Sequence, residues 1–327
     1  MQRTRTSRRS FLRRAFGLPD VFWILFFILL LIAILLPSLS RTREITKRAV
    51  CASNLRGIGQ AMKIYANDNV DWFPRHYFEA NKDPGGPPFN HGITWAGTMG
   101  SNDLLRISEA TSADKSPKKS HPSRSLFMLL IDGSCAPEHF VCPSSGDVKD
   151  DLRNRGPDAS GATRDVASMC GSNRFDFRGY SCLSYGYQLP YGPRAMPNEA
   201  LDTRVAILAD KGPYYEAGGE GLPGSDTVRD QRSAVAAPAA GEPNEILRRP
   251  NDTWSAYNSR NHNREGQNVV YVDGHVSFEK RPIVGVSFDN IYTIQTGYTV
   301  ADTLAGMVPD AKQTIGPLTN TDSFIVP

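Results

Sequence analysis

Histidine, aspartate and cysteine side chains are the first candidates for chemistry in this chain. The histidines are scattered: His76, His91, His121, His139, His262 and His275. The closest approach to a constellation is His262, Asp273 and His275, in which the last two flank Gly274. Imidazole and carboxylate groups are zinc ligands, so this trio is a candidate metal site and the candidate centre of a tethered hydrolase. The structural alternative, which we favour, is turn chemistry for Asp273 and a polar surface position for His275.

Other catalytic and cofactor signatures are missing from the sequence. It contains no nucleotide-binding loop, no HExxH and no GxSxG. Calcium held by aspartate and backbone carbonyls in a loop is conceivable, but no stretch has a dense alternation of acidic ligands. We therefore expect no catalytic residue, no metal and no cofactor, and a protein that is not an enzyme.

The five cysteines suggest disulfides, because such bonds persist in exported proteins. The pairing that we favour joins Cys51 with Cys142 and Cys170 with Cys182. Cys135 with Cys142 is a live alternative, since six residues separate them. An odd number of cysteines leaves one thiol over, and the sequence does not decide among these pairings.

The element that must position these residues begins with an uncharged apolar run, residues 21–40. A helix of twenty residues spans ~30 Å, about one bilayer hydrocarbon core. Six arginines precede the run and four lysines or arginines follow it closely, which favours a cytoplasmic N-terminus and an exported head. We expect a single-pass protein of the inner membrane, with residues 1–20 as a basic cytoplasmic, leader-like tail and residues 70–327 as a periplasmic head.

Charge also bears on partners. The first 48 residues carry ten lysines and arginines against Asp20 and Glu44, although the whole chain has a net charge of only +3. The basic charge therefore flanks the membrane segment and gives no reason to expect nucleic acid as a partner.

Helical character continues beyond the apolar run, so we expect one long helix over residues 21–69. Pro37 removes a backbone donor and predicts a kink near residues 33–37. An apolar stripe at helical spacing then predicts that residues 41–66 pack on the head. The stripe consists of Cys51, Leu55, Ile58, Met62 and Tyr65. A coiled-coil seam is the alternative for this stripe, and residues 67–69 (NDN) are expected to end the helix.

The head reads as an antiparallel sheet with long loop insertions, an α+β fold. Strands are expected in YSCLSYGYQL, in TRVAILAD and on both sides of Asp273-Gly274, which predicts a two-residue hairpin turn with positive φ. The apolar segment SLFMLLIDG is either a helix or a strand. Insertions are expected near residues 108–124, 145–165 and 212–250.

Several segments together resemble the type IV pilin-like proteins, or pseudopilins, in particular the large planctomycete-type group with a prepilin-like N-terminus. The first is LLIAILLPSLSRTREITKRAVCASNLRGIGQAMKIYANDN. FVCPSS, SYGYQ and ILAD resemble motifs of that group's head, and HNREGQNVVYVDGHVSF resembles its C-terminal pattern of a histidine followed by Asp-Gly. DNIYT and the final DSFIVP are also similar. The resemblance covers both ends and the middle of the chain, with unmatched insertions.

The resemblance implies a pilin-like fold and processing between Gly17 and Leu18. Two features depart from the pattern. Pro19 and Phe22 occupy the second and fifth positions after that bond, where the family has Glu at the fifth. Ten residues separate His262 from Asp273, one more than the pattern, which predicts a bulge in the strand.

These observations favour a non-enzymatic, membrane-anchored pseudopilin-like envelope protein. Its partners would be the lipid bilayer and other pilin-like subunits or secretion-assembly proteins, in a type II secretion or type IV pilus-like assembly or a surface structure. The alternative is an anchored extracytoplasmic binding module that enters no filament, with residues 212–250 as its contact surface. The tethered hydrolase is the third hypothesis.

Overall fold

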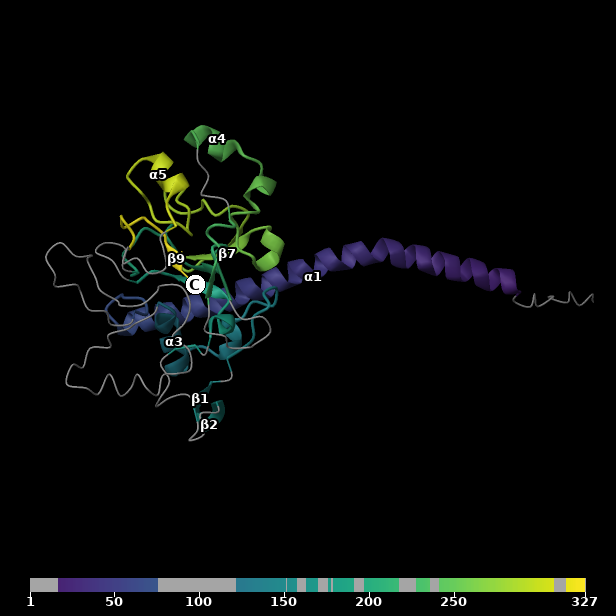
Figure 1. The fold of residues 1–327 in the computed structure, drawn as a ribbon, viewed down its shortest axis with the longest axis horizontal. Helices are drawn as coiled ribbons and strands as arrows, with labels where there is room; N and C mark the ends of the chain where they lie inside the picture. The colour runs from purple at the N-terminus through teal and green to yellow at the C-terminus, as the bar shows by residue number, and fades with distance from the viewer. Residues whose placement is uncertain are drawn as a thin grey trace, which may run out of the picture. The chain divides into compact units, whose positions relative to one another are not determined.

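The computed structural model describes most of the chain, and its secondary-structure elements are shown in Figure 1. The described residues are 17–75, 122–150, 152–157, 163–169, 176–177, 179–190, 197–217, 228–235, 241–308 and 316–326. The chain divides into two compact units, Met1–Thr46 and Lys47–Pro327.

The first element is the helix α1, Leu18–Asp68, which has 51 residues. It confirms the expected long N-terminal helix, and it is long and apolar enough to cross a membrane. The large apolar side chains from Val21 to Leu36 are exposed in the isolated chain. At the start of the helix, the Gly17 backbone N–H donates to Asp20 Oδ2 at 3.0 Å. The assignment is continuous through Pro37, and the kink stays a prediction.

The part of α1 that belongs to the second unit buries four of the five residues of the expected stripe, and the fifth, Tyr65, is half-buried against the same core. Cys51, Leu55, Ile58 and Met62 have no exposed surface, and they share one core cluster with residues of the sheet. Gly59 explains the close approach of the helix to strand β7, because a Cβ atom at this position would lie 3.1 Å from Val270 Cγ1. A helix without side-chain bulk at its contact point can lie closer to the sheet.

The sheet has five strands in the order β8-β7-β4-β3-β9, and every neighbouring pair is antiparallel. The strands are β3 Tyr185–Gln188, β4 Ala206–Asp210, β7 Gln267–Tyr271, β8 Val276–Glu279 and β9 Ile325–Val326. This confirms an α+β class. Strand β4 is apolar without alternation because core residues cover both of its faces: Ile207 and Leu208 belong to one cluster, and Ala206 and Ala209 to the other.

Short helices surround the sheet. SLFMLLI forms the helix α3, Ser123–Ile131, rather than a strand, and its apolar side joins the same core as α1. The remaining helices are α4 Pro243–Arg248, α5 Val300–Ala305 and the 3-10 turns η1 Pro137–Phe140, η2 Tyr180–Cys182, η3 Asn251–Trp254 and η4 Asn261–Arg264.

Two small hairpins lie in segments that we expected to be irregular insertions. They are β1 Arg153–Pro157 with β2 Thr163–Met169, and β5 Tyr215–Ala217 with β6 Val228–Asp230. Their residues lack a strong alternating pattern, so the pairing was not visible in the sequence. The expected strand over YSCLSYGYQL is shorter than predicted, because residues 180–182 form η2. Residues 108–121 of the first expected insertion lie outside the described residues.

The Asp273-Gly274 turn differs from the expected two-residue turn. The Gly274 N–H donates to Tyr271 O at 2.8 Å, and the Tyr271 N–H donates to His275 O at 3.1 Å. The connection thus has three residues and only Gly274 takes a positive φ, of 90°, as in hairpins that place glycine in the left-handed position. The expected bulge is not in β7 beside β8, where the register is regular. The irregular pairing falls between Ala206 and Leu208 of β4.

The C-terminal segment closes the edge of the sheet through β9 and buries two carboxyl groups. Asp289 Oδ2 accepts from the Ser323 N–H at 2.7 Å, and Asp322 Oδ2 accepts from the Leu318 N–H at 2.7 Å. Burial raises the pKa of Asp322 to about 7. Burial, and secondly the charge of Asp322, raise the pKa of Asp289 well above its usual range.

We expect these two acids to lower the stability of the head as pH rises. The folded state holds a proton on Asp322 up to about pH 7, whereas an unfolded aspartate releases it near pH ~4. We expect the free energy of unfolding to decrease between these values, and Asp322→Asn to flatten that decrease because the amide stays neutral. Urea titrations of the full chain in detergent at several pH values measure the slope. The exposed-site variant Asp252→Asn is the control, and equal slopes for both variants would contradict the assignment.

The packing of α1 is tested by two isoleucines of the same helix. Ile58 is fully buried, whereas Ile64 is 59% exposed. We expect Ile58→Ala to lower the free energy of unfolding by about 2–5 kcal/mol, because it leaves a cavity against the sheet. Ile64→Ala should change it by less than about 0.5 kcal/mol. Similar losses from both variants would show that this part of α1 is not packed on the head.

Candidate functional site

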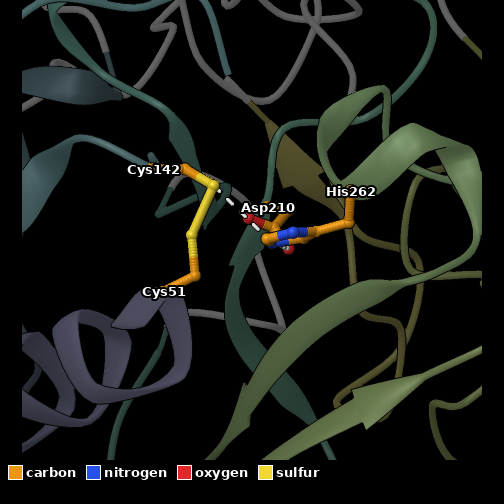
Figure 2. Close-up of side chains that lie close together, drawn as sticks. All are labelled: Cys51, Cys142, Asp210 and His262. Carbon is orange, nitrogen blue, oxygen red and sulfur yellow. Dashed lines mark hydrogen bonds and ion pairs between the residues drawn. A yellow bond between two sulfur atoms is a disulfide. The ribbon is translucent and has the colours of Figure 1, made fainter. Parts of the chain in front are cut away.

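Four buried side chains from separate segments lie close together in the head: Cys51, Cys142, Asp210 and His262. Their sulfur, carboxylate and ring-nitrogen atoms all lie within 4.8 Å of one another. Figure 2 shows how the four side chains point toward one another. Cys51 comes from α1, Cys142 from the loop after η1, Asp210 from the end of β4 and His262 from η4. Burial of four such groups together is unusual, because aspartate is rarely fully buried without partners.

The two cysteines form a disulfide, which is the first pairing favoured by the sequence. Their Cα atoms are 5.4 Å apart, within the usual range for such a bond. The bond ties α1 to a loop 91 residues further along the chain. It excludes the alternative pairing of Cys135 with Cys142. Cys135 is a buried free thiol, whose pKa is raised by burial to about 11.

The second favoured pairing involves a residue outside the described part of the chain. Cys182 is buried, but Cys170 lies outside the described residues. A bond between them therefore stays a prediction.

Asp210 is held by donors on both carboxylate oxygens. Oδ1 accepts from Asn261 Nδ2 at 3.0 Å, and Oδ2 accepts from the Asn268 backbone N–H at 2.7 Å. Burial raises the pKa of Asp210, and the nearby His262 is the strongest influence in the opposite direction. The hydrogen bonds compensate part of the cost of burying the carboxyl group.

His262 is presented by an unusual backbone. Residues 262, 263 and 264 have φ values of 56°, 57° and 61°, in the left-handed region. This conformation costs roughly 1–2 kcal/mol per residue for side chains other than glycine. The surrounding fold must supply that energy, and the turn directs the imidazole into the core.

The Nε2 atom of His262 faces three groups. It lies 3.2 Å from Asn268 Nδ2, 3.5 Å from Asp210 Oδ2 and 3.6 Å from Cys142 Sγ. The Asn268 amide and Nε2 of His262 thus form one hydrogen bond beside the Asp210 carboxylate. The edge of the ring also contacts Phe278 of β8, with the ring centroids 6.0 Å apart.

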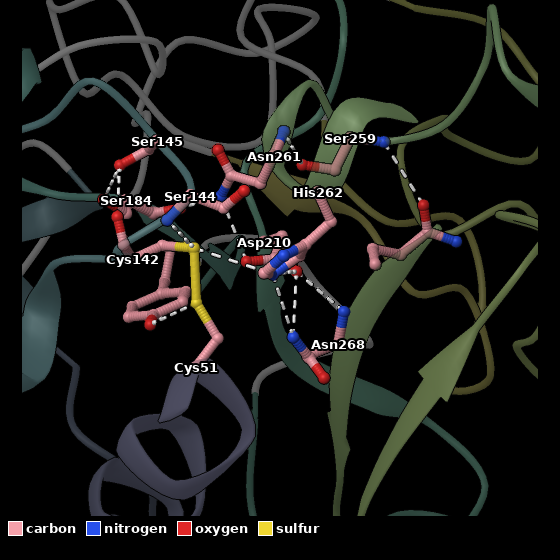
Figure 3. Close-up of polar contacts among 12 residues, drawn as sticks. Cys51, Cys142, Ser144, Ser145, Ser184, Asp210, Ser259, Asn261, His262 and Asn268 are labelled. Carbon is pink, nitrogen blue, oxygen red and sulfur yellow. Dashed lines mark hydrogen bonds and ion pairs between the residues drawn. A yellow bond between two sulfur atoms is a disulfide. The ribbon is translucent and has the colours of Figure 1, made fainter. Parts of the chain in front are cut away.

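Further polar groups surround the four residues (Figure 3). Tyr185 Oη donates to Cys51 Sγ at 3.3 Å, and the Ser144 N–H donates to Cys142 Sγ at 3.4 Å. Asn261 Nδ2 also donates to Ser184 O at 3.3 Å. These donors fix the orientation of the sulfur and carboxylate atoms.

A second buried ion pair lies beside this cluster. Lys211 Nζ is 3.3 Å from Asp147 Oδ2 and donates to Tyr180 O at 2.7 Å. Ser184 Oγ donates to the same carboxylate oxygen at 2.6 Å. Burial lowers the pKa of Lys211, while Asp147 opposes that shift. The ion pair thus joins the loop after η1 to the residue that follows β4.

The structure places the predicted metal trio in two different environments. His262 belongs to the buried cluster. Asp273 and His275 are more exposed and pair with each other, with Asp273 Oδ1 at 2.6 Å from His275 Nδ1 and accepting from the His275 N–H at 3.0 Å. Among the described residues, the group whose ligand atoms meet contains His262 but neither Asp273 nor His275.

Sequence reasoning missed Asp210, Asn261 and Asn268 as parts of a site. A signal for Asp210 existed, since it ends the apolar strand segment ILAD with a charge. The four residues of the buried cluster also lie in four of the segments that carry the pseudopilin resemblance. Cys51 lies in the first segment, Cys142 in FVCPSS, Asp210 in ILAD and His262 in HNREGQ. SYGYQ contributes Ser184 and Tyr185, which contact Asn261 and Cys51.

Comparison with known proteins identified no relative of this chain. The chain matches no protein-family description, no curated protein and no solved structure. The resemblance to pseudopilins therefore stays a prediction from the quoted segments.

The disulfide makes a quantitative prediction for stability. A loop of this length corresponds to about 4–5 kcal/mol of chain entropy in the unfolded state. We expect the double variant Cys51→Ala/Cys142→Ala of the oxidised protein to lose up to that amount in urea unfolding. Cys135→Ala, which removes a buried thiol outside the cluster, should lose about 1 kcal/mol. Non-reducing peptide mapping should recover the Cys51 and Cys142 peptides as one linked species. Recovery of two separate peptides would exclude the bond.

Proposed function

We propose that this protein is a non-enzymatic, membrane-anchored pseudopilin-like component of the cell envelope. It would act in a type II secretion or type IV pilus-like assembly or a related surface structure. The observation that carries the proposal is α1: one continuous helix, apolar and exposed over its first part, whose last turns bury a stripe in an antiparallel head. The proposed fold for the whole chain is accordingly pilin-like.

The apolar part of α1 supports a membrane anchor. Its exposed leucine, isoleucine and phenylalanine side chains extend for about the thickness of a bilayer core and would be unfavourable in water. The excess of arginine before the helix supports a cytoplasmic N-terminus and a periplasmic head, attached to the inner membrane by one span. The Cys51–Cys142 disulfide agrees with an oxidising location for the head.

The buried cluster supports a structural rather than an enzymatic role. Asp210 and His262 have no exposed surface, so a substrate in solution would not contact them. The remaining predicted trio members, Asp273 and His275, pair with each other in a hairpin turn. Partners in this proposal are lipid, through the first part of α1, and other pilin-like subunits or secretion-assembly proteins.

A specific observation favours the second candidate, a permanently anchored extracytoplasmic module. The helix already begins at Leu18, and Asp20 accepts from the Gly17 N–H, so the bond between Gly17 and Leu18 lies at a formed helix start. Pro19 adds to this restriction because its ring fixes the backbone. Phe22 also leaves the helix without the acidic residue that the resemblance would place there.

The N-terminus of the protein purified from its native membrane separates these two functions. If the protein enters a filament-type assembly, we expect a chain that begins at Leu18 and carries an N-methyl group. Intact-mass and N-terminal peptide mass spectrometry measure this directly. Gly17→Leu is the matched variant, and it should keep residues 1–17. A native protein that retains residues 1–17 would reject filament-type processing and leave the permanent anchor.

A further inference from the structure

We propose that Cys51, Cys142, Asp210 and His262 form a zinc site in the reduced chain, before the disulfide is made. The site would hold one Zn²⁺ ion through two thiolates, one imidazole nitrogen and one carboxylate oxygen. It goes beyond the structural function proposed above and does not depend on filament entry. Zinc bound by four protein ligands is the usual form of a structural zinc site.

The distances between the donor atoms fit a tetrahedral ion. With Zn–S of ~2.3 Å and Zn–N or Zn–O of ~2.1 Å, the edges of such a tetrahedron measure roughly 3.4–3.8 Å. His262 Nε2 lies 3.6 Å from Cys142 Sγ and 3.5 Å from Asp210 Oδ2, which are already edges of this length. The remaining pairs of ligand atoms lie within 4.8 Å of one another. The two bonded sulfur atoms must separate, and breaking the bond between them permits that.

The four side chains are also of the types that bind zinc once the disulfide is reduced. Nε2 of His262 is the ring nitrogen that faces the sulfur and carboxylate atoms, so in the neutral ring with its proton on Nδ1 this nitrogen would be the ligand. Asn268 Nδ2 would then keep its hydrogen bond to Asp210 Oδ2. A dication would neutralise most of the negative charge that two thiolates and Asp210 bring into a buried site. Without it, a reduced cluster would have to keep both thiols protonated beside the carboxyl group.

A shell of donors orients the ligands, as is typical of metal centres. Tyr185 Oη donates to Cys51 Sγ and the Ser144 N–H to Cys142 Sγ. Asn261 Nδ2 and the Asn268 N–H hold the Asp210 carboxylate. The ligands come from α1, the loop after η1, β4 and η4, so the ion would join segments far apart in the sequence and stabilise the folded head.

The zinc-bound and disulfide forms exclude each other, because both use the same two sulfur atoms. Conversion of one into the other conserves protons and electrons as follows. Zinc binding releases the two thiol protons to solvent. Oxidation by a disulfide-carrying oxidoreductase then transfers two electrons from the thiolates to the oxidant, which takes up two protons and becomes a dithiol. The Cys51–Cys142 bond forms and Zn²⁺ leaves, because a disulfide sulfur is a poor ligand compared with a thiolate. The site would thus hold the same contacts in place before and after oxidation.

Cobalt tests the site, because tetrahedral Co²⁺ with thiolate ligands gives a sulfur-to-metal charge-transfer band and intense visible bands. The full chain is reduced and unfolded in detergent, then refolded without oxygen in the presence of Co²⁺ or Zn²⁺. We expect one ion per chain by elemental analysis and the spectrum of a two-thiolate tetrahedral site. Oxidation should abolish the spectrum and release the ion.

Three variants make the test specific. Asp210→Asn and His262→Asn keep both cysteines, and asparagine tolerates the left-handed backbone at position 262. Each should weaken metal binding at least about tenfold. Cys135→Ala, at a buried thiol outside the cluster, should bind as the unchanged protein does.

Folding of each variant is checked by oxidising a parallel sample and mapping the Cys51–Cys142 bond. A variant that forms the bond but loses the metal supports the proposal. The proposal is overturned if the unchanged protein gives no charge-transfer band, if Asp210→Asn and His262→Asn leave binding unaltered, or if Cys135→Ala abolishes it.

Discussion

The burial of one face of α1 against the antiparallel sheet is the interaction on which the rest of the head depends. Leu55, Ile58 and Met62 have no exposed surface, and Gly59 allows the helix to lie close to β7. This burial is non-directional and scales with the apolar area removed from water. It brings the helix to the sheet, but by itself it does not select one rotation or one depth of insertion.

The polar cluster at Cys51 supplies that selection. The Cys51–Cys142 bond and the Tyr185 hydroxyl both meet the helix at Cys51, and the His262 ring lies against Cys142. Hydrogen bonds and covalent bonds require specific distances, so they restrict where α1 can lie on the sheet. The left-handed backbone at His262 is energetically unfavourable. Contacts of its ring with Asn268 of β7 and Phe278 of β8 help to hold that conformation.

The head buries acids in two ways that lead to different properties. Asp210 lies next to an imidazole and two asparagines. The asparagines donate hydrogen bonds to its carboxylate oxygens, and the imidazole nitrogen lies 3.5 Å from one of them. Asp289 and Asp322 lie among backbone donors and close enough for the charge of one to raise the pKa of the other. The first cluster is fully buried and adjoins the Cys51–Cys142 disulfide. Burial gives the second pair of carboxyl groups raised pKa values.

The local sequence by itself determined the helices and strands with strong periodicity. The stripe from Cys51 to Met62 and the runs around Asp210 and Asp273-Gly274 predicted α1, β4 and the β7–β8 hairpin, because hydrophobic spacing and turn chemistry act between near neighbours. It also narrowed the cysteine pairings to a few. The hairpins β1–β2 and β5–β6 were not predicted, since their residues carry no comparable hydrophobic pattern.

Only the tertiary structure decided which residues form the site. His262 had been grouped with Asp273 and His275 because they are near in sequence, yet its ring turns into the core to meet Asp210 and Cys142. Three residues in the left-handed conformation direct the ring into the core, and no sequence periodicity predicts such a backbone. Cys51 and Asp210 reach it from segments more than fifty residues away. Spacing along the chain reports neighbours within one element, whereas this site depends on how α1, β4 and η4 pack together.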